Sequence, residues 1–267
     1  MIVKLAFGTD TVAVDLRGLR VRPLQPSAPR GARDQARLVS RAVDFPLAGP
    51  PLDELARGRH SATVVVPDST RRAGLPEVLP VLFTRLIAAG VPASSIEVLV
   101  ACGTHPAAPD EEVRDLVGEL PSGVEVRQHS SRDPDRLVAV GDLRPGLPLR
   151  LDSGVVRSDL LITVGAVRHH YFAGFGGGPK MVFPGIAGID EIQANHSLVL
   201  RRRDGRLEHH PGCEPGRLDG NPVAEEIARA ADLRPPDLAL CLVAGRDGGI
   251  ASASAGPWRP AFDAAVG

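Results

Sequence analysis

Three short apolar runs constrain most strongly how this 267-residue chain folds. Residues 62–66 (ATVVV), 96–103 (IEVLVACG) and 158–167 (SDLLITVGAV) lack the strict alternation of a half-exposed strand. Such runs are typical of strands that are covered on both faces, as in a parallel sheet. Helical patterns at 76–90 and 109–118 follow the first two runs. This repetition predicts an α/β fold, with a Rossmann-like, mostly parallel sheet flanked by helices.

Further elements are expected on either side of these runs. They are strands at 2–7, 11–16 and 124–130, a loop at 23–33, and helices at 34–44, 52–57 and 187–201. Near the C-terminus, an Asp-Gly turn between two apolar segments predicts a hairpin, followed by the start of a helix. We therefore expect an N-terminal domain over 1–232, and the start of a truncated or missing C-terminal segment over 233–267.

Composition excludes several classes of protein. The net charge of −1 provides no electrostatic basis for binding nucleic acid or an anionic membrane. No apolar run reaches the roughly 20 residues of a membrane-spanning helix, and the N-terminus resembles a hairpin more than a signal peptide. Cys102, Cys213 and Cys241 lack CxxC spacing, so neither a zinc site nor a disulfide framework is indicated. A reducing cytoplasm is the expected location.

Polar segments follow three of the predicted strands. They are PDSTRR at 67–72, CGTH at 102–105 and RHHYFAGFGGGPK at 168–180. In an open parallel sheet, the loops after the carboxyl ends of the strands gather into one site. We therefore expect these three segments to meet.

The PDSTRR segment suits an anionic ligand. Asp68, Ser69 and Thr70 offer polar groups and backbone N–H groups to a phosphate or ribose, and Arg71 offers a bidentate pair of donors. A helix N-cap with solvated arginines would use the same residue types. The segment alone does not decide between these interpretations.

Three histidines are candidates for proton transfer or metal binding. His105 lies at a strand end, His170 beside the glycine run, and His196 on a predicted helix. Each is also compatible with a structural role, and no HxH or HExxH spacing demands a zinc site. Because neighbouring side chains of an extended segment point apart, only one of His169 and His170 should face the site.

The glycine run ends in a lysine. The glycines at 174 and 176–178 permit close approach of the backbone to a ligand. Lys180 suits a phosphate contact or a covalent link to a cofactor, and a simple flexible turn is the alternative. Tyr171 and Phe172 are expected to wall the same pocket.

Five segments together resemble the nickel-pincer lactate racemase family. They are LARGRH (55–60), DSTR (68–71), GTHPAAPDEE (103–112), HYFAGFGGGPKMVFPGIAGIDEIQANHS (170–197) and DGNPVAEEI (219–227). The resemblance covers nearly the whole chain and corresponds to the cofactor-binding, catalytic N-terminal domain of that family.

The resemblance implies a cofactor, nickel pyridinium-3,5-bisthiocarboxylate mononucleotide, made from a nicotinate precursor by separate biosynthesis proteins. It implies that Lys180 tethers this group and that His196 completes the nickel coordination. It also implies that His105 and His170 are acid/base residues on opposite sides of the substrate. The segment that holds the nucleotide would comprise Asp68, Ser69, Thr70 and Arg71.

The implied activity is racemisation or epimerisation of a small 2-hydroxy acid. Its Cα–H bond is only weakly acidic, so removal of a hydride is easier than removal of a proton when a base takes the hydroxyl proton. The pincer ring would accept that hydride and return it to the other face, with one histidine serving each enantiomer. Soft sulfur donors together with imidazole suit nickel.

The chain departs from the family pattern at several positions. Ser69 stands where a histidine is usual, Arg72 where a proline is usual, and Gly176 and Pro179 where serine and arginine are usual. These changes leave the identity of the 2-hydroxy acid open. In the family a C-terminal domain adds a lysine and a glutamine to the substrate site, so we expect the chain alone to need that domain as a partner.

Other functions were weighed against this one. A non-catalytic module that binds the nickel nucleotide would need neither His105 nor His170. An NAD-dependent oxidoreductase is disfavoured because no G-x-G-x-x-G follows a strand near the start of the chain. A metal hydrolase built on the three histidines is disfavoured because a carboxylate-rich ligand set is missing.

Overall fold

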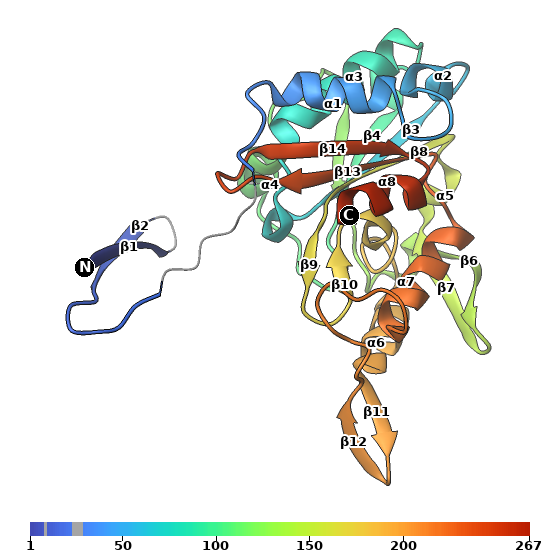
Figure 1. The fold of residues 1–267 in the computed structure, drawn as a ribbon. Coiled ribbons are helices and arrows are strands. Elements are labelled where there is room, and N and C mark those ends of the chain that lie inside the picture. Colours follow the sequence, from blue (N-terminus) through green and yellow to red (C-terminus); the bar gives the residue numbers. More distant parts are fainter. Residues whose placement is uncertain (8–9, 23–28) are drawn as a thin grey trace.

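A six-stranded sheet forms the centre of the protein (Figure 1). The computed structural model describes residues 1–7, 10–22 and 29–267. The strand order is β14-β13-β8-β3-β4-β5, and all neighbouring pairs are parallel except β13–β14. The strands are β3 (Ala62–Pro67), β4 (Ile96–Ala101), β5 (Glu125–Gln128), β8 (Leu160–Ala166), β13 (Leu238–Ala244) and β14 (Ile250–Gly256). The predicted α/β class with a mostly parallel sheet is confirmed.

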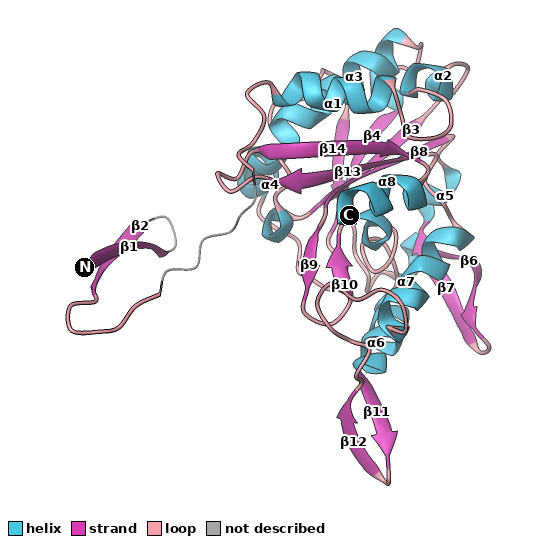
Figure 2. Cartoon of the chain, in the orientation of Figure 1, coloured by secondary structure: helices cyan, strands magenta, loops and turns pink. Residues whose placement is uncertain are grey.

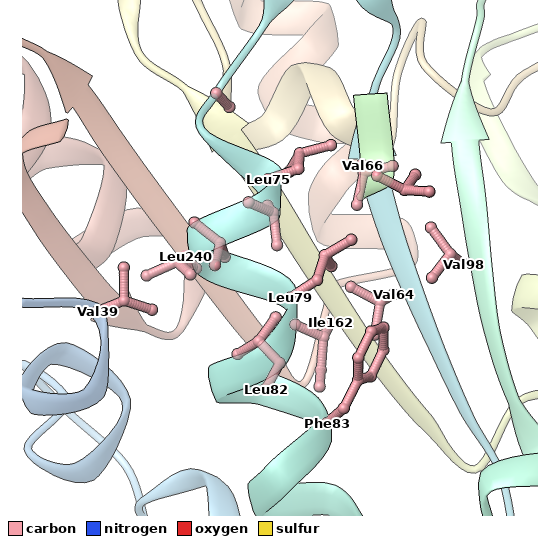
Figure 3. Close-up of a cluster of buried hydrophobic side chains, with 14 of the residues drawn as sticks. Val39, Val64, Val66, Leu75, Leu79, Leu82, Phe83, Val98, Ile162 and Leu240 are labelled. Carbon is pink, nitrogen blue, oxygen red and sulfur yellow. The ribbon is translucent and has the colours of Figure 1, made fainter. Parts of the chain in front are cut away.

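One face of the sheet is covered by the helices from the first half of the chain (Figure 2). They are α1 (Gln35–Asp44), α2 (Leu52–Ala56), α3 (Leu75–Ala88) and α4 (Asp110–Val117). Val64 and Val66 of β3 meet Leu79 and Phe83 of α3 in the large apolar cluster drawn in Figure 3. Each of these side chains is at most 1% exposed, so the burial stabilises the fold by roughly 1.5–3 kcal/mol per residue.

The other face is covered by later elements. Val65 of β3 and Leu99 of β4 point there, because successive side chains of a strand alternate between faces. This layer contains β6 (Leu137–Arg144), β7 (Leu147–Asp152), α5 (Ser153–Arg157), α6 (Ile189–His196), α7 (Pro222–Leu233) and α8 (Trp258–Val266). Two covered faces explain why the strand sequences are apolar throughout.

Three small antiparallel hairpins complete the described structure. They are β1 (Ile2–Phe7) with β2 (Asp10–Asp15), β9 (Arg168–His170) with β10 (Gly174–Gly176), and β11 (Leu200–Arg203) with β12 (Arg206–His209). The hairpin predicted at the N-terminus is present, shifted by one residue in its second strand. Of the loop expected at 23–33, residues 23–28 lie outside the described part of the chain and 29–33 have no helix or strand.

The helix predicted over 187–201 is wrong in its second half. Helix α6 ends at His196, and a short 3-10 turn leads into strand β11 at Leu200. The reason is the two-residue turn Asp204–Gly205, whose positive φ angles of 50° and 77° suit a tight hairpin. Pairing with β12 then provides hydrogen-bond partners for the backbone N–H and C=O groups of β11. In a longer helix these groups would have bonded within the helix instead.

Residues 233–267 contribute to the central sheet. Strand β13 pairs with β8, β14 pairs with β13, and α8 packs on both. Within the described residues this segment therefore shares a sheet with the elements before residue 232. The expectation that a further domain follows stays a prediction.

No helix in the described residues is both long enough and apolar enough to cross a membrane.

A buried ion cluster links the strand edge to the second layer. Arg127 of β5 donates to Glu97 of β4 at 2.7 Å and to Asp152 at 2.7 and 2.8 Å. The Asp152 side chain is 1% exposed and also accepts from the backbone N–H of Gly154 at the start of α5. Burial by itself raises the pKa of a carboxyl, but the Arg127 guanidinium holds the pKa of Asp152 well below its usual range.

Replacing Asp152 tests this cluster. Asp152→Asn should lower the free energy of unfolding by about 1–3 kcal/mol at pH 7, because the half-buried Arg127 guanidinium loses the charge of one of its two carboxylate partners and keeps only Glu97. The folded pKa of Asp152 is depressed, so its contribution is present above about pH 4 and declines as the pH falls below that value. Urea titrations from pH 7 to pH 3 measure both effects.

Asp115→Asn is the matched control, because this carboxylate is exposed on α4. It should change stability by less than about 0.5 kcal/mol. Equal stabilities for Asp152→Asn and Asp115→Asn would contradict the proposed importance of the cluster.

Candidate active site

A cleft lies where β3, β4 and β8 end, and it gathers the three polar segments that the sequence singles out. It is lined by Asp68 and Arg71 after β3, by Cys102 to His105 after β4, and by residues of the segment after β8. The parallel pairing of β3 with both neighbours brings these strand ends to the same edge. Six of the eight predicted site residues line it: Asp68, Arg71, His105, His170, Lys180 and His196.

Asp68 orients His105. One oxygen of its carboxylate caps the turn Ser69–Arg71 by accepting from the backbone N–H of Thr70 at 3.1 Å and from its hydroxyl at 2.6 Å. The other oxygen contacts Nδ1 of His105. An ionised carboxylate only accepts hydrogen bonds, so Nδ1 carries the proton and Nε2 keeps its lone pair. His105 is therefore held in the tautomer of a general base.

His170 carries its proton on the other nitrogen. The backbone N–H of Ala173 donates to Nδ1 of His170 at 3.2 Å, which places the proton of the neutral ring on Nε2. The ring packs against Tyr171 and Phe172, with centroid distances of 4.8 and 4.6 Å. Burial, reinforced by the positive charges of Lys180 and Arg71, lowers the pKa of His170 to about 3. The ring is thus neutral near pH 7 and presents an N–H donor.

Lys180 reaches the cleft from a glycine-rich turn that lies directly on β8. The φ angle of Gly177 is 72°, and a Cβ at this position would lie 2.6 Å from the carbonyl oxygen of Ala166, so only glycine fits. Burial and the charge of Arg71 lower the pKa of Lys180 to about 7. A substantial fraction of its amine is therefore neutral and nucleophilic at physiological pH.

His196 is placed by α6 with one nitrogen free. Its Nδ1 donates to the carbonyl oxygen of Ile192, one helical turn earlier, at 2.8 Å. The Nε2 lone pair is consequently available, which is the arrangement typical of a metal-binding histidine. Burial lowers the pKa of His196, which keeps the ring neutral. The Phe172 ring lies 5.2 Å away, centroid to centroid.

Buried polar contacts anchor α6 and were not identified from the sequence. Asn195 donates to Glu226 of α7 at 3.1 Å and to the carbonyl oxygen of Val223 at 3.2 Å. Glu226 also contacts Arg144 of β6, and Glu191 contacts Arg150 of β7. The sequence contains one weak signal for these contacts. Glu191 and Asn195 lie four residues apart on α6 and therefore share one face of the helix.

Two predicted site residues lie outside the cleft. The Ser69 hydroxyl contacts the carboxylate of Glu112 on α4, and the Thr70 hydroxyl donates to Asp68. Both residues line a neighbouring hollow on the far side of His105. Their predicted contact with a nucleotide stays a prediction, whereas the N-cap interpretation of this segment describes their hydrogen bonds.

The aromatic residues beside His170 differ from each other. Phe172 is buried, and its ring lies 5.8 Å from Nζ of Lys180. Tyr171 is 74% exposed, and neither ring is among the residues that line the cleft, so the expectation that both wall the pocket is wrong. Phe172 packs behind the lining, against His170 and His196. His169 points away from the cleft and packs on Phe175, in agreement with the expected alternation.

The cleft supplies few protein ligands for a metal ion. Among the described residues, no group of three or more His, Cys, Asp or Glu side chains is arranged to hold a metal. A metal at His196 would therefore need most of its donors from a bound molecule.

These features define an α/β protein with a cationic, imidazole-lined cleft at the carboxyl ends of a parallel sheet. Residues 7–207 match the family described as the lactate racemase N-terminal domain. The chain therefore belongs to the lactate racemase family, through the N-terminal domain.

Relatives and solved structures agree with this assignment. The chain is 34% identical over 194 residues to the lactate racemase of Lactiplantibacillus plantarum, covering 72% of this chain and 44% of that protein. It is 28% identical over 233 residues to the lactate racemase of Thermoanaerobacterium thermosaccharolyticum, covering 86% and 53%. The lactate racemase apoprotein structure from the latter organism matches all of this chain and 61% of that chain, with a TM-score of 0.82 and 26% identity.

The chain spans about half the length of these curated relatives. A solved structure of a Thermotoga maritima protein matches 87% of this chain and 59% of its own chain, with a TM-score of 0.65. At 20% identity, this match shows similarity of fold alone.

Removing the Lys180 amine should stabilise the protein. Lys180→Met should raise the free energy of unfolding by about 1–3 kcal/mol near pH 7, because a buried amine no longer has to be held partly deprotonated. The folded pKa lies below the unfolded one, so the gain should grow as the pH falls from 10 to 7 and vanish above about pH 10.5. Chemical denaturation across this pH range measures the gain.

The chain has only one other lysine, Lys4, which is exposed on β1. Lys4→Met is therefore the matched control and should leave stability unchanged at every pH. A Lys180→Met protein that is less stable than wild type at pH 8 would contradict the lowered pKa of Lys180.

Proposed function

We propose that this chain is the cofactor-holding half of a lactate-racemase-like enzyme that racemises or epimerises a small 2-hydroxy acid with a nickel-pincer nucleotide. The observation that carries the proposal is the convergence of four groups in one cleft. A nucleophilic lysine, a histidine with a free Nε2, and two oppositely protonated histidines meet there: Lys180, His196, His170 and His105.

The residues of the cleft fit the cofactor that the family resemblance implies. The amine of Lys180 suits a covalent link, and the free Nε2 of His196 suits nickel when the other donors are soft sulfur atoms. The guanidinium of Arg71 suits the phosphate of a mononucleotide. The single available imidazole also fits, because a pincer ligand brings its own donors to the metal. Biosynthesis proteins that make this group are the expected partners.

The two histidines differ in what they do to a substrate. When bound, the cofactor would supply a hydride acceptor and donor for Cα of the substrate. His105, with Nε2 free and Nδ1 held by Asp68, accepts the hydroxyl proton of one enantiomer. His170 carries its single proton on Nε2, so it donates a hydrogen bond to the carbonyl oxygen and stabilises the charge there. To release a proton when the opposite enantiomer forms, this ring must first take up a second proton, and the transfer then leaves His170 neutral and His105 protonated.

A non-catalytic carrier of the nickel nucleotide is the second candidate, favoured by the presence of Lys180, His196 and Arg71 in the same cleft. A carrier requires Lys180, His196 and the nucleotide segment. It does not require the Asp68–His105 pair, whose hydrogen bond serves proton transfer. The racemase proposal accounts for that pair and is preferred.

Intact-mass spectrometry of protein produced together with the cofactor-making enzymes tests the proposal. We expect an adduct on Lys180 and about one nickel per chain, because the neutral amine and the free imidazole face the same cleft. Peptide mapping is unambiguous because Lys4 is the only other lysine. Protein with neither adduct nor nickel would refute the cofactor assignment.

Two histidine variants distinguish nickel binding from covalent attachment of the cofactor to Lys180. His196→Ala should lower bound nickel at least tenfold. His209→Ala, an exposed histidine on β12, is the control and should retain nickel.

Racemisation itself should depend on more than these residues. The family resemblance assigns a lysine and a glutamine of the substrate site to a C-terminal domain, so the loaded 267-residue chain should interconvert D- and L-lactate at least 100-fold more slowly when alone than with that domain added in trans. Chiral chromatography of the products measures the rate. Rapid racemisation by the chain alone would show that the site is already complete.

A further inference from the structure

Arg168 shares a strand face with a predicted acid/base residue. It is the first residue of β9 and lies two positions before His170, so the two side chains emerge on the same side. Its register partner is Gly176, which lines the cleft. A Cβ on Gly176 would lie 3.7 Å from Cγ of Arg168, so the aliphatic part of the arginine passes directly over this glycine.

A hydrogen bond turns the Arg168 guanidinium toward the loop after β3. Its Nη2 donates to the carbonyl oxygen of Arg72 at 3.2 Å, and Arg72 follows Arg71 in the chain. Because Arg72 directly follows Arg71, this hydrogen bond places the Arg168 side chain beside the loop that carries Arg71. Burial and then the charge of Arg71 lower the pKa of Arg168, in line with this placement. The hydrogen bond to a neutral carbonyl leaves most of the guanidinium donors free.

The two guanidiniums lack a compensating carboxylate. None of Arg71, Arg72 and Arg168 forms an ion pair with any described residue. Asp68, the carboxylate that lines the cleft, is committed to His105 and Thr70. Adjacent unpaired guanidiniums repel each other, and an oxyanion between them removes that repulsion while accepting their N–H groups.

We propose that Arg168 and Arg71 form an anion subsite at the rim of the cleft, which binds a carboxylate or phosphate group of the ligand. The subsite makes this cleft selective for ligands with a second negative charge. If the charge belongs to the substrate, the preferred 2-hydroxy acid is a dicarboxylate, a conclusion that rests on the proposed function. If it belongs to the nucleotide, Arg168 is an additional anchor for the phosphate.

Isothermal titration calorimetry at low ionic strength tests the subsite, because salt weakens exposed charge pairs. The probes are malate, which is a dianion, lactate, which is a monoanion, and nicotinate mononucleotide, which carries a phosphate. Wild-type protein should bind malate or the nucleotide at least fivefold more tightly than Arg168→Gln does. Lactate affinity should change less than twofold between these proteins.

The matched control is Arg202→Gln. It makes the same change in charge on the exposed strand β11, away from the cleft, and should bind all three probes as the wild type does. Arg168→Lys keeps the charge and loses the planar fork, so it should give an intermediate affinity. Thermal unfolding of each variant confirms that it is folded.

The pattern of losses identifies the source of the anion. A loss for malate identifies a substrate carboxylate, and a loss for the nucleotide alone identifies its phosphate; each supports the subsite. Equal affinities of wild type and Arg168→Gln for every probe would overturn it, as would an equal loss in Arg202→Gln or no binding of any probe by wild type. The Lys180 adduct and the nickel content are measured in a separate experiment. A result that refutes the proposed function therefore leaves the test of the subsite valid, and a result that refutes the subsite leaves the test of the function valid.

Discussion

Parallel pairing of β3 with β4 on one side and β8 on the other is the constraint on which the rest of the structure depends. Parallel strands end at the same edge, so the residues after them meet although they are far apart in sequence. The pairing is possible only because both faces of the sheet are covered, by α3 and its neighbours on one side and by α5 to α8 on the other. Without either layer, the buried valines of β3 would be exposed and the cleft would lose its floor.

The cleft brings cationic and neutral side chains together with few carboxylates to balance them. Burial, with a smaller contribution from the charge of Arg71, lowers the pKa of both Lys180 and His170, and Asp68 is held by His105. Such a site is unfavourable for the folded protein and is retained because the large apolar clusters outweigh it. The same imbalance makes the site complementary to an anionic ligand, and it keeps an amine and an imidazole in their neutral, reactive forms.

Hydrogen bonds outside the cleft decide what each imidazole offers within it. Asp68, Ala173 and Ile192 each engage Nδ1 of a different histidine, and the direction of each bond sets the state of the opposite nitrogen. A carboxylate and a carbonyl oxygen accept, leaving a lone pair on Nε2, whereas a backbone N–H donates and leaves a proton there. Three identical side chains thereby differ in what they present: two have a free Nε2 lone pair and one has an Nε2–H donor.

The sequence by itself determined the α/β class, most strand and helix positions and six of the residues that line the cleft. Apolar periodicity is local, and the alternation of strands and helices along the chain is enough to predict that parallel strand ends meet at one edge. It did not determine that a tight turn at Asp204 ends the pattern after α6, nor that Ser69 faces away from the cleft. Tertiary structure alone decided which nitrogen of each histidine is free and how Arg168 reaches the loop after β3. These properties depend on groups distant in sequence whose distances and hydrogen bonds exist only after the sheet has formed.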